Sequence, residues 1–407
     1  MSNIITGLDI GSSHIKGIVA ETKKDGALSV ITAFKYPSVG FHRGVLIDAE
    51  EAVSVLHDIA RDLEKVSKGA VKNVFINVNS EHIKARSSRG IVAVSRSDQE
   101  IQQEDIDRVI QASRAVKLLP NHCVLHNITR EYFVDDIGDI LDPISLTGSR
   151  LEVSTLIIEG FSPQVNFLTK NVERAGMIIR GLIFNPLASA RAVLTKRQKD
   201  LGVVLIDFGA DTTTLAVYEE NKVLHTKSIP LGSNYITKDI AIGLKTSIDI
   251  AEELKIQYGN AFSKDVSRRD TIRLSEIDSE NKDEVSKRFL AEIIEVRLAE
   301  ILDLVNNELK SVGCAGRLPG GAVITGGGIK LIGITELIRQ TLKLSVQTGT
   351  PNINRFEVTN PTHQSLLEDS EFSTAAGLVL FGTDGSTRKK EYDPKELIRN
   401  IFKNLMP

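Results

Sequence analysis

The chain has 407 residues, of which 41% are hydrophobic and 25% charged, and its formal net charge at pH 7 is −3. This length exceeds one ordinary hydrophobic core, so we expect two lobes or more. The mildly acidic balance argues against a nucleic-acid partner, since general nucleic-acid binders are strongly basic. Only two cysteines occur, in no metal-ligand spacing, which excludes a disulfide framework and favours a reducing, cytosolic setting.

The first elements alternate as in an α/β fold. Runs of β-branched residues separated by turns predict three strands over 4–10, 14–22 and 28–35. Asp48 is placed to cap a helix, with Glu51 three residues later and an apolar stripe behind it. The segment VKNVFINVN, at 71–79, predicts another buried strand.

Residues 84–162 have a different pattern, which we interpret as an inserted α+β subdomain. They combine the strand IVAVS, an amphipathic helix from about Gln103, a polar stretch around 122–130 and the strand LEVSTLIIEG. A helix over 163–175 and a strand over 178–184 return to the first lobe. NPLASARAVLTKRQ is expected to be one helix that begins at Pro186.

The second half predicts a similar alternation. The further expected elements are a helix in SNYITKDIAIGL, a helix in TSIDIAEELKIQYGNA, short strands and loops over 261–287, a long helix over about 284–311, a strand, triple-glycine turn and helix in AVITGGGIKLIGITELIRQTL, a helix over 373–382 and a polar linker over 383–393.

The most informative pattern is a strand–turn signature that occurs twice. ITGLDIGSSHIKGIVAE carries Asp9 and Gly11, and GVVLIDFGADTTTLAVYEE carries Asp207 and Gly209. Each strand ends in Asp-x-Gly before a hydroxyl-rich turn, where small residues let backbone N–H groups approach phosphate oxygens closely. One copy alone would favour an ordinary turn, but two copies favour a nucleotide held from both sides. The pattern matches neither a Walker A loop nor a GxGxxG motif.

From this pattern we predict an ATP site. The expected phosphate contacts are Gly11, Ser12, Ser13, Lys16, Gly209, Ala210, Thr212, Thr213 and, in the following turn, Gly232. Asp9 and Asp207 are expected to hold the waters of a Mg²⁺ ion, which keeps much of its hydration shell. The expected adenosine contacts are the glycine run Gly326, Gly327 and Gly328 and, toward the ribose, Glu252 and Lys255. Glu252 and Lys255 could equally form an everyday surface ion pair.

The C-terminal segment PKELIRNIFKNLMP predicts a short amphipathic helix. Its apolar stripe consists of Leu397, Ile398, Ile401, Phe402 and Leu405, and its basic edge of Lys395, Arg399 and Lys403. Such a helix suits an anionic membrane surface, although it could also dock on the protein itself or in a partner groove. One helix of this size binds marginally, so stable attachment requires several linked copies and therefore self-assembly.

The order of DIGSSHIK, NPLASARAVL, DFGADTTTLAVY, AEELK and TGGGIK resembles the actin–Hsp70–sugar kinase superfamily. Within it, essentially the whole chain resembles the FtsA family of bacterial cell-division proteins. The resemblance implies a two-lobed α/β fold of duplicated ribonuclease H-like domains, with an inserted subdomain and a C-terminal amphipathic helix. The implied parts are lobe 1 (1A) at 1–83 and 163–198, the insert (1C) at 84–162, lobe 2 (2A) at 199–242 and 319–382, its small subdomain (2B) at 243–318, the linker at 383–393 and the membrane-targeting helix at 394–407.

The resemblance also implies a function. FtsA-like proteins bind ATP, form actin-like polymers and tether filaments of the tubulin-like FtsZ to the inner face of the cytoplasmic membrane at the division site. Other division proteins would bind through the insert. Arg297 and Asn306 are carried over as contacts to the acidic, apolar C-terminal peptide of FtsZ.

One position argues against rapid hydrolysis. Hydrolytic members of the superfamily place Glu or Gln at the start of the connecting helix, where this chain has the shorter Asn185. We therefore expect strong ATP binding with weak or absent turnover. Two alternatives stay open, an actin-like adaptor of a type IV pilus assembly similar to PilM, and a sugar kinase of the same fold. The sequence shows no obvious acidic base with sugar-binding residues for the kinase.

Overall fold

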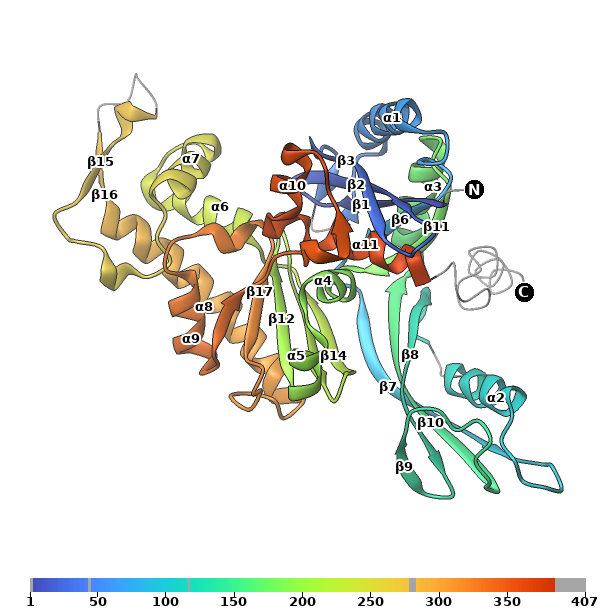
Figure 1. Ribbon diagram of the computed structural model, residues 1–407. Coiled ribbons are helices and arrows are strands. Elements are labelled where there is room, and N and C mark those ends of the chain that lie inside the picture. The colour runs from blue at the N-terminus through green and yellow to red at the C-terminus, as the bar shows by residue number, and fades with distance from the viewer. Residues whose placement is uncertain (1–2, 43–44, 116–117, 278–282, 385–407) are drawn as a thin grey trace.

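The computed structural model describes residues 3–42, 45–115, 118–277 and 283–384 (Figure 1). Two lobes are each built on a mixed sheet. The first sheet has the order β11-β6-β1-β2-β3-β19, and the second has the order β14-β13-β12-β17-β18. The strands of the first sheet are β1 (Asn3–Ile10), β2 (His14–Thr22), β3 (Leu28–Pro37), β6 (Val74–Val78), β11 (Ile179–Phe184) and β19 (Phe356–Glu357). Those of the second are β12 (Val203–Phe208), β13 (Thr213–Glu219), β14 (Lys222–Ile229), β17 (Ala322–Thr325) and β18 (Val346–Thr348).

The two sheets repeat one topology. In each, a hairpin pairs antiparallel and its first strand pairs parallel with a later strand, β1 with β6 and β12 with β17. Asp9 therefore lies opposite Lys16 in the first hairpin, and Asp207 lies opposite Thr214 in the second. Because parallel strands end at the same edge of a sheet, both aspartates are delivered to an edge where ligands commonly bind. The expected two-lobed fold of duplicated α/β units is confirmed.

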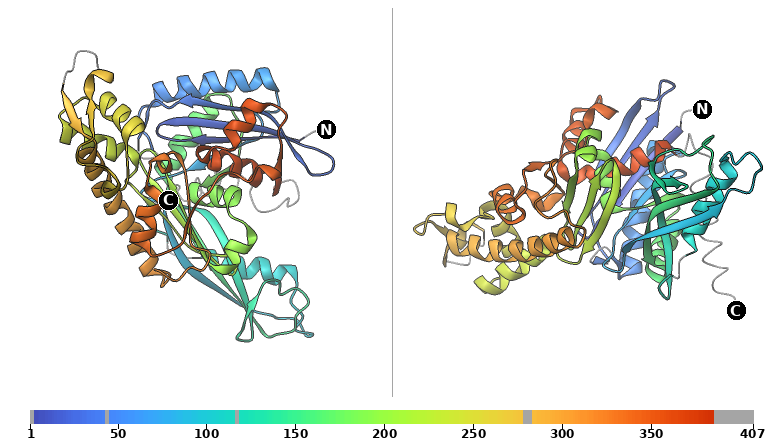
Figure 2. Two further views of the ribbon diagram at one scale, coloured as in Figure 1. Left: turned by 60° about the vertical axis from the view of Figure 1, so that its left-hand side comes forward. Right: turned by 90° about the horizontal axis from the view of Figure 1, so that it is seen from below.

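Two helices join the lobes. α4 (Asn185–Val193) follows the strands of the first lobe but contacts β12, and α11 (Ser373–Asp384) follows the second lobe but contacts β1. The helices approach so closely that a Cβ atom on Gly377 would lie 1.9 Å from the Ala188 carbonyl oxygen. Figure 2 shows α11 on one face of the first sheet and α1 (Ala49–Val66) on the opposite face. The glycine thus sets the spacing of the helix pair between the lobes.

The helix α1 forms as its sequence predicts. The Asp48 side chain accepts hydrogen bonds from the backbone N–H groups of Glu50 and Glu51, which satisfies two orphan donors of the first turn. The residues that α1 buries are Ala52, Leu56, Ile59, Ala60 and Leu63. With α3 (Ser162–Arg174), this helix covers the outer face of the first sheet.

A separate antiparallel sheet projects from the first lobe (Figure 1). Its strands are β7 (Lys84–Ala93), β10 (Arg150–Phe161), β8 (His122–Val134) and β9 (Ile137–Ile140), in that order. The helix α2 (Gln103–Arg114) packs on β7 and β10, around a small apolar core of its own. Its β8 also reaches the second lobe, since Arg130 Nε donates to the Val223 carbonyl oxygen at 2.8 Å. This unit is the expected inserted α+β subdomain.

The second lobe carries a helical layer beyond its sheet. Its helices are α6 (Ser233–Leu244), α7 (Ile248–Tyr258), α8 (Lys287–Ser311) and α9 (Ile334–Leu342). The remaining elements are β4 (Phe41–His42), β5 (Val45–Leu46), α5 (Lys196–Leu201), η1 (Ser263–Asp265), β15 (Thr271–Arg273), η2 (Leu274–Glu276), β16 (Glu284–Ser286), η3 (Gly327–Lys330), η4 (Ile353–Arg355), α10 (Pro361–Leu367) and η5 (Ser370–Phe372). Among the described helices, none is both long and apolar enough to cross a membrane.

Several local expectations were wrong. NPLASARAVLTKRQ forms two helices, because Leu194 leaves the helical conformation and Thr195 caps α5 by accepting from the Gln198 backbone N–H. α4 begins at Asn185 rather than at Pro186. The polar stretch 122–130 belongs to the long strand β8, and α11 continues to Asp384. The rest of the expected linker and the whole terminal helix lie outside the described residues.

The helix pair gives a test of the packing. Gly377→Ala should lower the free energy of unfolding by about 2 kcal/mol or more, because the rigid Ala188 backbone cannot move aside. The measurement is the midpoint of urea unfolding, which should fall. Gly243→Ala in α6 is a matched control, since its Cβ would meet only the mobile end of Ile293. The control should be neutral or slightly stabilising. Equal midpoints for the two variants would contradict the close approach.

Candidate functional site

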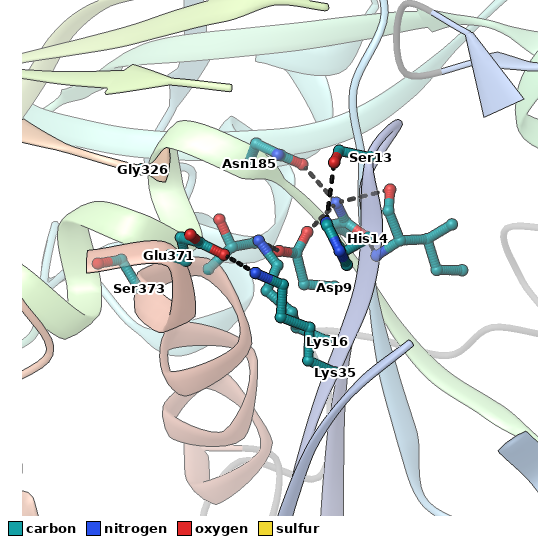
Figure 3. Close-up of polar contacts among 12 residues, drawn as sticks. Asp9, Ser13, His14, Lys16, Lys35, Asn185, Gly326, Glu371 and Ser373 are labelled. Atoms are coloured by element: carbon teal, nitrogen blue, oxygen red, sulfur yellow. Dashed lines mark hydrogen bonds and ion pairs between the residues drawn. The ribbon is translucent and has the colours of Figure 1, made fainter. Parts of the chain in front are cut away.

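The first turn is organised around Asp9, a buried carboxylate at the end of β1 (Figure 3). Lys16 Nζ lies 3.0 Å from Asp9 Oδ2, and the turn closes with a hydrogen bond from the Gly11 N–H to the His14 carbonyl oxygen. Burial disfavours the charged amine, but Asp9 outweighs it, helped by Glu371 and Asp207, and raises the pKa of Lys16. The turn therefore holds a permanent positive charge beside its backbone N–H groups.

The second turn repeats this closure. The Gly209 N–H donates to the Thr212 carbonyl oxygen at 2.9 Å, as Gly11 does to His14 in the first turn. Asp207 Oδ2 accepts from Ser189 Oγ of α4 at 2.7 Å and from Thr374 Oγ1 of α11 at 3.4 Å. The second carboxylate is thus held by both helices that join the lobes.

The two carboxylates act on each other electrostatically. Burial raises the pKa of Asp207, the Ser189 hydrogen bond lowers it, and the negative charge of Asp9 raises it further. A cation between the carboxylates would relieve this repulsion. No group of three or more His, Cys, Asp or Glu side chains suited to a metal occurs among the described residues. The pair fits Mg²⁺ better than a fully protein-bound metal, because Mg²⁺ takes one or two carboxylates with waters and phosphates.

Asn77 connects the ends of three parallel strands. Its Oδ1 accepts from the Ile10 N–H at 2.6 Å, and its Nδ2 donates to Asp9 Oδ1 at 2.8 Å and to Asn185 Oδ1 at 2.9 Å. Asn185 is therefore brought to the same edge as Asp9, as Figure 3 shows. Sequence reasoning missed Asn77, although a polar residue near the end of an apolar strand was an available signal.

Asn79 crosses from the first lobe to the second turn. Its Nδ2 donates to Thr212 Oγ1 at 2.7 Å, and its Oδ1 accepts from Ser228 Oγ at 2.8 Å. Close by, His42 Nδ1 lies 3.0 Å from Asp211 Oδ2. Sequence reasoning missed these contacts too. They hold the second turn against the first lobe.

Gly232 supports the second turn from behind. A Cβ atom at this position would lie 2.5 Å from the Ala210 carbonyl oxygen, so only glycine fits. The Ser233 and Asn234 N–H groups donate to the carbonyl oxygens of Gly209 and Ala210. The start of α6 is thereby packed directly on the predicted phosphate turn. Thr213 Oγ1 donates to the Leu231 carbonyl oxygen at 2.8 Å, so its hydroxyl serves the same packing.

The glycine run lies against the second aspartate. Gly326 has φ +91°, and a Cβ there would lie 2.4 Å from Asp207 Oδ1. A Cβ on Gly328 would lie 3.0 Å from Phe208 Cβ, and one on Gly327 would lie 3.4 Å from Glu371 Cγ. The sequence pattern therefore located a backbone that must approach its neighbours closely, next to the carboxylate predicted for the metal.

Glu252 and Lys255 share a face of α7, as their spacing predicts. Lys255 Nζ lies 2.7 Å from Glu252 Oε2 and donates to Thr237 Oγ1 and to the Ser233 carbonyl oxygen. Burial lowers the pKa of Lys255, and the Glu252 carboxylate opposes that shift. Lys255 is nearly buried, so the pair is no ordinary surface pair. It fixes the start of α6 and, through Gly232, the second turn.

A chain of ion pairs that the sequence did not reveal crosses between the lobes. Glu371 accepts from Lys35 Nζ of β3 at 2.5 Å and from Lys330 Nζ, just past the glycine run, at 2.7 Å. Burial favours the neutral acid, but the hydrogen bonds and charges of Lys330 and Lys35 dominate and lower the pKa of Glu371 to about 2. Figure 3 shows Glu371 reaching Lys35 close to Lys16 and Asp9.

The residues predicted for peptide binding lie on α8. Arg297 donates from Nε and Nη2 to the Asp239 carboxylate of α6, at 2.5 and 3.0 Å, and from Nη1 to Glu300. Arg297 thus pairs α8 with α6, while Asn306 is half-buried further along the helix. The predicted membrane residues 394–407 lie beyond the described part of the chain.

Comparison with known proteins agrees with this architecture. The family model "Cell division protein FtsA" matches residues 204–377, and the model "SHS2 domain inserted in FTSA" matches residues 80–159. The chain is 32% identical to the cell division protein FtsA of Pseudomonas aeruginosa, over 93% of this chain and 89% of that protein. It is 34% identical to FtsA of Bacillus subtilis, over 93% and 83%, and 30% identical to FtsA of Escherichia coli K12, over 94% and 90%.

Solved structures of lower identity share the fold. A chain of the PilM–PilN type IV pilus biogenesis complex superposes with a TM-score of 0.67 at 18% identity, covering 93% of this chain and 98% of that one. MreB5 of Spiroplasma citri bound to ADP superposes with a TM-score of 0.54 at 14% identity, covering 93% and 96%. At these identities the likeness establishes the actin-like fold alone.

The ion pairs of Glu371 predict a dependence on pH. Because the folded pKa of Glu371, about 2, lies below its ordinary value of 4.5, its stabilisation is present above pH 4.5 and is lost as the pH falls toward 2. Glu371→Gln should therefore lower the free energy of unfolding at pH 7 by on the order of 3 kcal/mol at most. The loss is measured as a lower midpoint of urea unfolding.

The control for this prediction is Glu368→Gln, an exposed residue three positions earlier. It should leave the midpoint nearly unchanged at every pH. The deficit of Glu371→Gln should shrink between about pH 5 and pH 3. A deficit of the same size at both ends of that range would show that the carboxylate charge is not what matters.

Proposed function

Because this chain belongs to the FtsA family of cell division proteins, we propose that it is an ATP-binding, actin-like protein that polymerises and tethers FtsZ filaments to the membrane. The observation that carries the nucleotide part is the pair of matching turns with Asp9 and Asp207. The same two-lobed fold in MreB5 of Spiroplasma citri is bound to ADP. PilM-like and kinase functions rest on fold alone, whereas the FtsA relatives match in sequence over nearly the whole chain.

The ATP phosphates would lie between the two turns. Gly11, Ser12 and Ser13 would offer N–H groups from one lobe, and the second turn would offer those of Gly209 and Ala210. Lys16 would place its ammonium on the phosphates, exchanging part of its contact with Asp9. Asp9 and Asp207 would orient the waters of Mg²⁺, whose bound charge offsets that of the phosphates. Gly326, Gly327 and Gly328 would lie along the adenosine.

The nucleotide would act by being bound, which fixes the two lobes in a closed arrangement, rather than by being hydrolysed. Asn79, His42 and Glu371 already make contacts between the lobes. A ligand held by both turns would add differential binding energy for one lobe angle and so favour the conformation that assembles. Asn185 would be the residue that orients an attacking water, but its Oδ1 accepts from Asn77 and its side chain is short. We therefore infer weak or absent turnover.

Three further surfaces complete the proposal. The FtsZ C-terminal peptide would bind beside α6 and α8, where Ile242 is 76% and Val296 is 71% exposed and Arg297 and Asn306 lie nearby. Other division proteins would bind the inserted sheet. The amphipathic segment 394–407 would attach the chain peripherally to the inner face of the cytoplasmic membrane at the division site.

Nucleotide binding is tested by Lys16→Met. Loss of one charged phosphate contact should weaken ATP binding at least tenfold, on the order of 1.4 kcal/mol. The measurement is titration of a fluorescent ATP analogue with and without Mg²⁺. Lys24→Met, an exposed substitution of the same type, should leave the affinity unchanged.

Phosphate release should stay far below about 1 s⁻¹. Fast release that Asn185→Ala abolishes would overturn the closure role.

Tethering is tested with vesicles that contain anionic lipid and with FtsZ filaments. The double variant Ile401→Asp, Phe402→Asp should neither float with the vesicles nor carry FtsZ with it, because burial of each apolar side chain contributes about 1.5–3 kcal/mol. Ser386→Asp, Thr387→Asp adds the same charge to the linker and should float normally. FtsZ that still floats with the double variant would refute the terminal helix as the anchor.

A further inference from the structure

Five basic residues lie on α4, α5 and η4. We call this set the α4–α5 basic cluster, and its members are Arg191, Lys196, Arg197, Lys199 and Arg355. Arg355 Nη1 donates to the Arg191 carbonyl oxygen at 2.9 Å, which brings η4 onto the end of α4. Segments more than 150 residues apart in sequence thus bring positive charge to one place.

The positive charges of the cluster repel one another. Burial and, to a smaller extent, the charges of Arg191 and Arg355 together lower the pKa of Lys199 to about 8. Within the described ranges, no carboxylate forms an ion pair with Lys196, Arg197 or Lys199. The neighbouring Asp200 accepts from Asn221 Nδ2 at 2.9 Å instead. In a chain with a net charge of −3, such a concentration needs an explanation.

Aromatic faces hold two of the cations in place. Lys199 Nζ lies 4.8 Å from the centre of the Tyr218 ring, and the Arg191 guanidinium lies 5.1 Å from that of Phe381. A cation–π contact of this kind orients the Lys199 ammonium without neutralising its charge. Lys199 and Arg191 are thereby held in defined positions, whereas Lys196 and Arg197 are exposed.

The cluster also lies where the body meets the tail. Phe381, which Arg191 covers, belongs to the last turn of α11, which ends at Asp384. Pro394, at the start of the proposed membrane helix, comes ten residues after Asp384. Ten residues span at most about 36 Å. If the terminal helix lies in a membrane, the basic cluster is tethered within a short distance of the headgroups.

We propose that the α4–α5 basic cluster binds the phosphate groups of anionic lipids and forms a second contact between this protein and the membrane. The inference rests on the proposed membrane attachment. Guanidinium and ammonium groups both recognise phosphate oxygens, and each basic residue at an anionic surface strengthens binding about fivefold. A single point of attachment does not fix the orientation of the body. A second contact fixes which face of the body turns toward the membrane.

The test compares two triple variants of the full chain. Lys196→Gln, Arg197→Gln, Lys199→Gln removes three charges from the cluster. Lys264→Gln, Arg268→Gln, Arg269→Gln removes three exposed charges from the second lobe near η1. Both are assayed with vesicles of phosphatidylcholine alone and with vesicles that also contain phosphatidylglycerol, and ATP binding serves as the check on folding.

We expect the cluster variant to bind anionic vesicles at least about tenfold more weakly than the control variant, with no difference on neutral vesicles. Equal binding of the two variants to anionic vesicles would overturn the cluster while leaving the terminal anchor intact. If the unmodified chain binds neither kind of vesicle, the proposed attachment fails and the inference fails with it. Thermal stabilisation by millimolar inorganic phosphate, without any difference between the variants on vesicles, would assign the cluster to a free phosphate instead.

Discussion

The structure depends on bringing two carboxylates, the buried Asp9 and the half-buried Asp207, together from separate lobes. Each comes from the first strand of a hairpin whose other neighbour is parallel, so both are carried to the ligand-binding edge of their sheets. Their mutual repulsion opposes closure. Lys16 offsets it on one side, and the hydroxyls of Ser189 and Thr374 offset it on the other. A nucleotide with its cation would remove the remaining repulsion.

The contacts between the lobes connect the repulsion between Asp9 and Asp207 to the angle between the lobes. α4 and α11 each belong to one half of the chain but pack on the sheet of the other, and Gly377 lets their backbones approach closely. Asn79, which precedes α4 in the chain, and the ion pairs of Glu371, which directly precedes α11, join the lobes again. Because all these groups are directional, they tolerate only a narrow range of lobe angles. A ligand that selects one angle would therefore fix the relative position of the two lobes.

The fold of this protein is shared more widely than its family membership. The two sheets and the helix pair are shared with structures whose identity is below 20%, including a pilus protein and MreB5. The FtsA family models match the inserted sheet and the second lobe, and FtsA relatives match in sequence over nearly the whole chain. Sites added to a common scaffold thus distinguish members of the fold, as the insert, the terminal segment and the basic cluster would do here.

The sequence alone determined the local features. The Asp-x-Gly turns, the glycine run, the Asp48 cap and the pairing of Glu252 with Lys255 all follow from patterns within a few residues. Only the tertiary structure decided which groups meet across the lobes. Asn77, Asn79 and Glu371 bond to partners 41 to 336 residues away. Periodicity records how a segment folds on itself, whereas long-range partners depend on the order of strands in the sheets, which no local pattern encodes.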